Sequence, residues 1–414
     1  MKTKLNKFII QFTVEGISVV GNLKNSYVIG LDQKGKELIE YIEKYNMLPK
    51  EIPESLLPLV ETLQKKEFIE TGNDNVLQQK CLKSAYLHVT DHCNLHCLGC
   101  YSYVERRNVQ KELNLEEHKR ILDALTEAGV DTLVISGGEP FLREDIDLIC
   151  KYAKEKGIVT LQVISNGTMP LWKYDKTIPY IDKLTISLDG FADGITYIRD
   201  EGIMPSIEAV INHCKKFVET SFVATLHKKN LYLQDKYMEL SERLGVDFNF
   251  SLLTVKADNE VFRDFLIKRE DFMELLNQKQ KSEQCRNAGK VEPCTCTLEC
   301  RTSCEAGKSM ISVSASGDVY PCHMLHQPEL CMGNILKERV EKLLNSEKNY
   351  LRNWNIDNKI PCKDCQYKYL CGGGCHARAY LENGDFGKPD STCVVTQYEL
   401  HRYFEYIKSV YNTH

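Results

Sequence analysis

The first 78 residues follow a pattern of short strands and then helices. Three β-favouring runs are separated by turn residues: 8–14, 17–20 and 27–30. Apolar residues then recur at helical spacing over 35–45 and 54–66. Three strands followed by helices in so small a unit predict a winged-helix-like domain at residues 1–78.

The pattern changes at residue 82, after which apolar strands alternate with helices. Six strand candidates lie at residues 86–90, 132–136, 161–165, 184–188, 222–226 and 248–253. Between most of these strands, apolar residues recur at helical spacing, at residues 115–128, 146–156, 207–218 and 237–244. Near-continuous apolar strands interleaved with helices indicate an α/β fold with a parallel sheet. We therefore expect a partial, TIM-like (β/α)6 barrel over residues 82–284, with its chemistry at the C-terminal strand ends.

This alternation is lost after residue 285. Glycine, cysteine and short apolar runs follow one another instead. Such a composition is expected where metal centres replace part of a hydrophobic core. Residues 285–414 are therefore predicted to form a third, metal-binding domain.

Charge and hydropathy narrow the class of protein. Lys and Arg number 53 against 58 Asp and Glu, a net charge of −5, which argues against a strongly basic nucleic-acid binder. The most apolar N-terminal stretch, residues 8–20, is interrupted by Gln11, Glu15 and Gly16. Neither a membrane span nor a signal peptide is predicted. We expect a cytoplasmic protein that binds neither nucleic acid nor a membrane.

The distribution of the 18 cysteines indicates two metal-binding regions. Disulfides are rare in a reducing compartment, so grouped cysteines there indicate metal binding or redox chemistry. One tight group, Cys93, Cys97 and Cys100, lies in the predicted barrel, and twelve cysteines lie between Cys285 and Cys393. The two groups are far apart in the chain, so each is expected to form its own site.

The first group directly follows the first barrel strand, as Cys93-x3-Cys97-x2-Cys100-Tyr101. Three thiolates at these spacings can bind three corners of a cubic iron–sulfur cluster and leave the fourth iron open to an amine and a carboxylate. The spacing alone also leaves a zinc knuckle open, with His92 or His96 as the fourth ligand.

In this context the segment resembles the cysteine motif of the radical S-adenosylmethionine (SAM) superfamily, aromatic Tyr101 included. The next strand ends in a segment that resembles the glycine-rich motif of that family: Gly137, Gly138, Glu139 and Pro140. Glycines there would let backbone carbonyls approach the methionyl ammonium group of SAM closely. The resemblance implies that one electron from the cluster cleaves SAM and that the resulting 5′-deoxyadenosyl radical abstracts a hydrogen atom from the substrate.

The resemblance also implies SAM contacts at the ends of the later strands. The expected residues are Ser165, Asn166, Ser187, Asp189, Arg199 and Leu253. Arg199 is expected to pair with the SAM carboxylate, because a guanidinium group binds a carboxylate in bidentate fashion.

The C-terminal cysteines resemble the SPASM extension of peptide-modifying members of the superfamily. The matching array is Cys304, Cys322, Cys362, Cys365, Cys371, Cys375 and Cys393, with Gly317 between the first two. The resemblance implies two auxiliary [4Fe–4S] clusters. One would bind Cys362, Cys365, Cys371 and Cys393, and the other would bind Cys304, Cys322 and Cys375 with a fourth, upstream ligand. Cys300 is favoured for that place, with Cys294, Cys296 and an open site as alternatives. The glycines at 372–374 would let backbone amides approach the cluster sulfurs.

The N-terminal domain resembles the small PqqD-like peptide-recognition domain of enzymes that modify ribosomally made peptides. The resemblance implies that the leader of a precursor peptide adds as a strand, bordered by Ser26–Gly30 and Glu54–Lys66. The alternative is a zinc-stabilised winged-helix regulator that binds DNA. Residues 33–66 carry mixed charges and no basic recognition stripe, which disfavours that alternative.

These features together predict a radical SAM–SPASM peptide maturase. By analogy with sactipeptide and ranthipeptide maturases, the favoured reaction joins a cysteine sulfur of the substrate to a carbon, as a thioether. The alternatives are a carbon–carbon crosslink, an epimerisation or another oxidation on a peptide, a protein or a tetrapyrrole. A small electron donor such as flavodoxin or ferredoxin is the expected redox partner.

Overall fold

The computed structural model describes residues 3–70, 82–102, 107–109, 111–189, 198–256, 260–262, 264–286 and 298–411. Cys294 and Cys296, two of the candidates for the upstream cluster ligand, lie outside these residues. Among the described helices, none combines the length and the apolar character that a membrane crossing requires.

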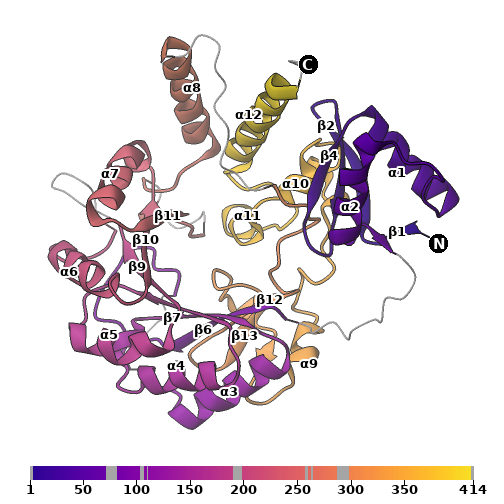
Figure 1. The fold of residues 1–414 in the computed structure, drawn as a ribbon. Coiled ribbons are helices and arrows are strands. Elements are labelled where there is room, and N and C mark those ends of the chain that lie inside the picture. The colour runs from indigo at the N-terminus through magenta and orange to yellow at the C-terminus, as the bar shows by residue number, and fades with distance from the viewer. Residues whose placement is uncertain are drawn as a thin grey trace.

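Six parallel strands form the central sheet, as the alternation of strands and helices predicts. Their bounds are β6 Ser84–Thr90, β7 Thr132–Gly137, β8 Thr160–Ser165, β9 Lys183–Leu188, β10 Glu219–Leu226 and β11 Asp247–Leu252, in sequential spatial order. The helices between them are α3 Leu115–Glu127, α4 Ile146–Glu155, α5 Leu171–Thr177, α6 Met204–Cys214 and α7 Gln234–Leu244. These helices cover one face of the curved sheet (Figure 1). The expected α/β fold with a partial barrel is confirmed.

The central sheet continues into the C-terminal part of the chain. Strand β12 (Met310–Val313) pairs in parallel with β6, and β13 (Asp318–Tyr320) and β14 (Gly333–Asn334) extend the sheet antiparallel. The barrel and the C-terminal cysteine region are therefore joined by main-chain hydrogen bonds. This junction places the residues after β13 next to the first barrel strand.

The N-terminal domain has the expected order of three strands followed by helices. Its sheet comprises β2 Ile9–Val14, β3 Ile17–Asn22 and β4 Val28–Leu31, and its helices are α1 Gln33–Tyr45 and α2 Leu57–Lys65. A short pair, β1 Lys4–Leu5 with β5 Ile69–Glu70, closes the domain. Its core is formed by apolar residues from the sheet and both helices, among them Val20, Ile39 and Leu63.

The remaining helices belong to the C-terminal part, and two of them lie against the N-terminal domain. They are α8 Arg269–Arg286, α9 Val340–Leu344, α10 Lys368–Cys371, α11 His376–Asn383 and α12 Cys393–Tyr411. The N-terminal domain lies beside α10 and α12 (Figure 1), where Val14 and Val19 pack with Leu400 and Phe404.

A polar contact at the β2–β3 turn reinforces this apolar interface. The Glu15 carboxylate accepts hydrogen bonds from the Tyr367 hydroxyl, His401 Nδ1 at 3.1 Å and Lys408 Nζ at 3.3 Å. The Tyr367 hydrogen bond, together with those from His401 and Lys408, lowers the pKa of Glu15 to about 2 against the effect of burial. The carboxylate is therefore held in its charged form at the interface.

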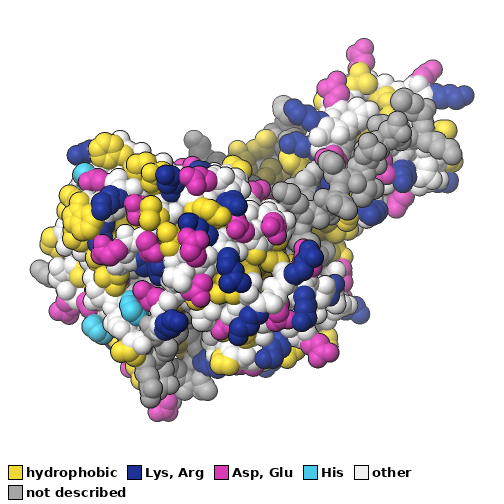
Figure 2. All heavy atoms as spheres, turned by 90° about the horizontal axis from the view of Figure 1, so that it is seen from below, with side chains coloured by type: hydrophobic (Ala, Val, Ile, Leu, Met, Phe, Trp, Pro, Cys, Tyr) yellow, Lys and Arg dark blue, Asp and Glu magenta, His cyan; other side chains and the backbone are white. Residues whose placement is uncertain are grey.

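Charges of both signs are mixed on the face of the molecule that is seen from below. Figure 2 shows lysines and arginines lying among aspartates and glutamates there. This mixture agrees with the small net charge of −5.

Candidate active site and auxiliary cysteine sites

The segment after β6, residues 91–102, carries the first three cysteines and is called the cysteine loop below. Cys93 is held by its backbone amide, which donates to Asn108 Oδ1 at 2.8 Å. The Leu98 amide donates to the Ile198 carbonyl at 2.6 Å. Gly99 has a φ of +68°, and a side chain there would lie 2.5 Å from Leu253 Cδ1. The loop is therefore folded back tightly, with its thiols turned to one cavity.

Two arginines face the three thiols. Burial raises the pKa of Cys97 to about 11, although the Arg199 guanidinium, whose Nη1 lies 3.6 Å from Cys97 Sγ, opposes the rise. Burial acts in the same direction on Cys100, but Arg107, with Nη2 at 3.4 Å from Cys100 Sγ, and Ser102 lower its pKa overall. Positive charge thus lies where thiolates or a negatively charged cluster would be bound.

The glycines at the end of β7 are required by backbone packing. The Gly138 amide donates to the Thr90 carbonyl at 2.7 Å, and a Cβ at Gly138 would lie 2.0 Å from the His92 carbonyl oxygen. Gly137 has a φ of +130°, and a Cβ there would lie 2.3 Å from the Thr90 carbonyl oxygen. Because both obstacles are backbone atoms, only glycine lets the end of β7 lie against the cysteine loop.

Glu139 and Pro140 are not among the residues that line the cavity, which disfavours contacts between their side chains and SAM. The fully buried Glu139 carboxylate accepts from the Asn166 amide at 2.7 Å, the Phe141 amide at 3.0 Å and Ser165 Oγ at 3.0 Å. Burial raises the pKa of Glu139 to about 7, against the effect of these hydrogen bonds. Glu139 follows β7, and its partners Ser165 and Asn166 lie at the end of β8. Its carboxylate therefore links the two strand ends.

A cavity of about 280 Å³ lies at the C-terminal strand ends. The expected residues that line it are Cys93, Cys97, Cys100, Tyr101, Gly137, Gly138, Ser165, Asn166, Ser187, Asp189, Arg199 and Leu253. Lining residues that the sequence analysis missed include Tyr86, Ser102, Arg107, Ile198, Thr225, Ser251, His323 and Met324. Strand periodicity could have identified Tyr86, Thr225 and Ser251, because alternate residues of a strand share one face.

Arg199 has a partner within the protein. Its guanidinium forms an ion pair with Asp189, whose side chain is fully buried at the end of β9. Asp189 Oδ1 also accepts from the Thr225 amide at 3.1 Å. Arg199 therefore connects strands β9 and β10 to the cysteine loop, and it lines the cavity together with Cys97.

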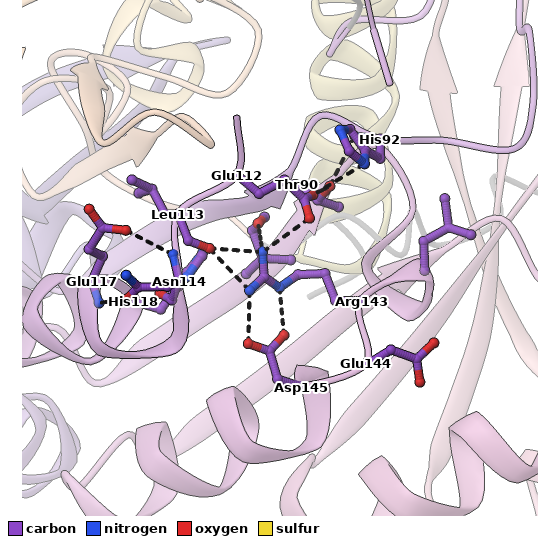
Figure 3. Close-up of polar contacts among 12 residues, drawn as sticks. Thr90, His92, Glu112, Leu113, Asn114, Glu117, His118, Arg143, Glu144 and Asp145 are labelled. Carbon is purple, nitrogen blue, oxygen red and sulfur yellow. Dashed lines mark hydrogen bonds and ion pairs between the residues drawn. The ribbon is translucent and has the colours of Figure 1, made fainter. Parts of the chain in front are cut away.

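A second arginine fixes the base of the cysteine loop (Figure 3). The buried Arg143 guanidinium binds both carboxylate oxygens of Asp145, at 2.8 and 2.9 Å, and donates to the Val89 and Leu113 carbonyls at 3.2 Å. Glu112 lies 3.7 Å away and accepts from the Thr90 hydroxyl. The strand end from which the loop departs is thereby held by a buried, charged network.

The two histidines of the zinc-knuckle alternative are paired with carboxylates. His92 Nδ1 lies 3.7 Å from Glu112 (Figure 3), and His96 Nδ1 lies 3.6 Å from Asp200. The His96 side chain is 84% exposed. This arrangement disfavours a zinc site formed by the cysteine loop and either histidine.

Four of the C-terminal cysteines form a group that we call the C-terminal quartet. Its members are Cys362, Cys365, Cys371 and Cys393, which influence one another electrostatically. Burial raises the pKa of Cys371, and hydrogen bonds from the Gly373 and Gly374 amides oppose the rise. Residues 372–374 all have positive φ, between +64° and +90°. The glycines thus allow amides to approach a sulfur, as predicted.

Three further cysteines, Cys304, Cys322 and Cys375, form the C-terminal trio. Burial raises the pKa of Cys322 to about 12, with added contributions from the other two thiols. Cys304 Sγ lies 2.8 Å from Nδ1 of the buried His376, and Cys375 Sγ accepts from the Arg378 amide at 3.5 Å.

Cys300 lies apart from this trio, which disfavours its expected role as the fourth ligand. Its side chain is buried against β3, where a Cβ at Gly21 would lie 2.3 Å from Cys300 Sγ. Its amide donates to the Ser26 carbonyl at 2.8 Å. Burial alone raises its pKa to about 12, without a contribution from another thiol. Cys300 therefore anchors the C-terminal part to the N-terminal domain.

The separation of the sulfurs bears on the zinc alternative. A single tetrahedral zinc ion holds thiolates about 3.8 Å apart, given a Zn–S distance of about 2.3 Å. Among the residues that the structure describes, no three cysteine sulfurs lie within 4.8 Å of one another. Each cysteine group therefore contains sulfurs that lie farther apart than the ligands of one zinc ion.

Comparisons with known proteins agree with this geometry. Residues 87–233 match the radical SAM superfamily, and residues 304–366 match the SPASM iron–sulfur cluster-binding domain. An AdoMet-dependent heme synthase of Methanosarcina barkeri is 26% identical over 74% of this chain and 94% of its own length. A PqqA peptide cyclase of Bradyrhizobium diazoefficiens is 23% identical over 75% of this chain and 85% of its own.

Solved structures share the fold. The structure of anSMEcpe with AdoMet and the Cp18Cys peptide superimposes with a TM-score of 0.62 at 17% identity, covering 80% of this chain and all of that one. The structure of Streptococcus suis SuiB bound to the precursor peptide SuiA gives 0.56 at 14% identity, covering 95% of this chain and 99% of that one.

The chain therefore carries a radical SAM domain at residues 87–233 and a SPASM iron–sulfur cluster-binding domain at residues 304–366. These two domains imply [4Fe–4S] clusters and SAM as its cofactors. The grouped thiols can bind iron–sulfur clusters, and the cavity with its adjacent arginines can accept SAM.

Proposed function

We propose that this enzyme modifies a ribosomally made precursor peptide and installs a thioether between a cysteine sulfur and a carbon. The observation that carries the proposal is the cavity at the strand ends, where three thiols meet Arg107, Arg199 and the backbone of two glycines. Cys93, Cys97 and Cys100 would hold the cluster that binds SAM. When bound, this cluster and SAM supply one-electron cleavage and hydrogen-atom abstraction.

The chain's own residues position and shield this chemistry. Arg107 and Arg199 stabilise negative charge at the sulfurs. The Tyr101 hydroxyl is fixed by Ser136 Oγ at 2.6 Å, so the ring keeps one orientation beside Cys100. Ile198 and Leu253 are buried at the cavity wall and exclude water, which protects a reactive intermediate from side reactions.

Tyr86 of β6 and His323, which follows β13, line the cavity where the barrel meets the SPASM domain. Their rings stack at a centroid distance of 4.1 Å, and His323 directly follows Cys322 of the C-terminal trio. A peptide side chain that enters the cavity from this side would lie between the cysteine loop and the trio. The C-terminal quartet and trio would hold the two auxiliary clusters.

A peptide substrate is supported by the N-terminal domain and by the relatives. The SuiB likeness covers 95% of this chain, and that structure contains a precursor peptide. In this chain β4 ends the three-stranded sheet, and Tyr27 at its start is 39% exposed, with Lys66 Nζ 4.4 Å from its ring centroid. An edge strand beside a helix is suited to binding an extended leader segment by main-chain hydrogen bonds.

Leader binding can be tested in the full-length protein by fluorescence anisotropy with a labelled leader peptide. Tyr27→Ala should weaken binding at least fivefold, because it removes contact area beside β4. Tyr45→Ala is the matched control, since Tyr45 is 50% exposed at the far end of α1. Equal affinities for both variants would argue against leader binding at β4.

The bond itself can be identified by mass spectrometry of a co-expressed precursor. A thioether requires the loss of two hydrogens, and that loss should disappear when the cysteines of the peptide are replaced by alanine. A crosslink that survives this replacement would refute the thioether.

A tetrapyrrole is the second candidate substrate, because the relative at 26% identity is named a heme synthase. Incubation of the reconstituted enzyme with an iron porphyrin, followed by absorption spectroscopy, distinguishes the two candidates. SAM-dependent change of the porphyrin without change of the peptide would overturn the peptide proposal.

A further inference from the structure

Lys359 is a buried cation that pairs with no carboxylate in the described part of the chain. The residue is 2% exposed and lies between two short 3-10 turns, Ile356–Asn358 and Ile360–Cys362. Its Nζ donates to the Gly373 carbonyl at 3.1 Å and lies 5.3 Å from the Trp354 ring centroid. Within the described ranges no carboxylate lies in ion-pair distance of Nζ. A buried ammonium group is costly unless negative charge compensates it.

The carbonyl that binds Lys359 lies between the two C-terminal cysteine groups. Gly373 is the middle residue of the segment that runs from Cys371 of the quartet to Cys375 of the trio. Its position is rigid, because a Cβ there would lie 2.7 Å from the Trp354 ring and 3.0 Å from Ile356. The ammonium group is therefore fixed at the junction of both groups.

Lys359 is linked by contacts to both sides of this junction. On the quartet side, its carbonyl accepts a hydrogen bond from the Cys362 amide at 2.9 Å. On the trio side, the Trp354 ring that faces Nζ packs edge-on against His376 at a centroid distance of 3.9 Å, and His376 Nδ1 lies 2.8 Å from Cys304 Sγ. A single ammonium group therefore lies beside residues that reach both sets of sulfurs.

We propose that Lys359 is the shared counterion of the two auxiliary clusters and a positioning residue for their redox chemistry. The proposal rests on the proposed assignment of the quartet and the trio as cluster ligands. A cluster bound by thiolates is negatively charged and gains one more negative charge when dithionite reduces it by one electron. A fixed cation stabilises the reduced form more than the oxidised form, so it raises the reduction potential.

The inference explains why a lysine is buried here without a carboxylate. The negative charge that compensates it would come from the clusters themselves. The Trp354 face and the Gly373 carbonyl then hold the ammonium group at one place between them. Loss of the Lys359 charge should therefore affect the auxiliary clusters and leave the cavity at the barrel strand ends intact.

The test uses the full-length protein with Cys93, Cys97 and Cys100 replaced by alanine, so that only the auxiliary clusters remain. Iron content and an EPR-monitored potentiometric titration are measured for this background and for Lys359→Met, Lys359→Arg and Lys363→Met added to it. Lys363 is exposed and lies four residues away, so its loss changes the net charge equally. A background protein without iron would refute the cluster assignment itself, separately from the counterion.

With iron present, Lys359→Met should lower the equilibrium constant for reduction of an auxiliary cluster at least tenfold, about 59 mV for one electron. Lys359→Arg should restore it to within threefold, and Lys363→Met should change it less than twofold. Loss of iron in Lys359→Met with retention in Lys359→Arg also supports the counterion. Three results would overturn the counterion: an unchanged reduction potential in Lys359→Met, a shift in Lys363→Met as large as that in Lys359→Met, or loss of iron in both Lys359→Met and Lys359→Arg.

Discussion

Substitution of Gly138 tests the packing on which the active site depends. A Cβ at this position would lie 2.0 Å from the His92 carbonyl oxygen and 2.6 Å from its carbon. Both are backbone atoms of the cysteine loop and cannot rotate away as a side chain could. Gly138→Ala therefore requires the loop to move relative to the end of β7.

The magnitude follows from the cost of overpacking, typically 1–3 kcal/mol. The contact falls far inside van der Waals distance and involves backbone on both sides, so we expect the upper end, about 3 kcal/mol. If the loop relieves the clash by leaving its native position, the fraction with correctly placed thiols falls about a hundredfold, since 1.4 kcal/mol corresponds to a factor of ten.

The assay is SAM binding by equilibrium dialysis on anaerobically reconstituted protein, together with iron analysis and thermal unfolding. Gly138→Ala should bind SAM about a hundredfold more weakly or lose the iron of one cluster, while the auxiliary iron remains. Gly30→Ala is the control, because a Cβ there meets only Ile17 at 3.8 Å. Full iron and normal SAM affinity in Gly138→Ala would refute the packing argument.

Two further predictions concern the interface of the N-terminal domain. The pKa of Glu15 is lowered to about 2 in the folded protein. Its ionised form therefore stabilises the fold above the unfolded pKa of about 4.3, and this contribution is lost as pH falls toward 2. Glu15→Gln should therefore lower the stability by about 1–2 kcal/mol throughout pH 5–8, after allowance for solvent screening, in chemical denaturation; no difference from the wild type at pH 7 would contradict this. Cys300→Ala should retain all cluster iron, whereas Cys322→Ala should lose about four irons per chain; iron loss in Cys300→Ala would reinstate it as a ligand.

Local sequence patterns predicted the strands, and the resemblance to the radical SAM superfamily supplied most of the residues that line the cavity. Residues such as Ser165 and Ser187 could be predicted because the end of a parallel strand fixes which side of the sheet its last residues face. Likewise, the glycines at 137 and 138 could be recognised at the end of the second strand, although the backbone contacts that require them come from the cysteine loop.

Features that depend on distant segments could not be predicted in this way. Cys300 lies four residues before Cys304, a spacing that suits a further cluster ligand. Its side chain nevertheless packs against Gly21, which lies far away in the sequence. Glu139 lies within a motif, yet its carboxylate is occupied by the amide of Asn166 on the next strand. The pairing of β12 with β6 involves only four residues of β12, too few for a periodic signal.

The central claim is that Cys93, Cys97 and Cys100 present a cluster with an open iron to SAM. The most direct measurement is EPR spectroscopy of the dithionite-reduced, reconstituted protein with and without SAM, combined with detection of 5′-deoxyadenosine. The account predicts that SAM changes the spectrum and that deoxyadenosine is released, and that both effects disappear in the variant with all three cysteines replaced by alanine. An unchanged spectrum and no deoxyadenosine from the iron-loaded wild type would contradict it.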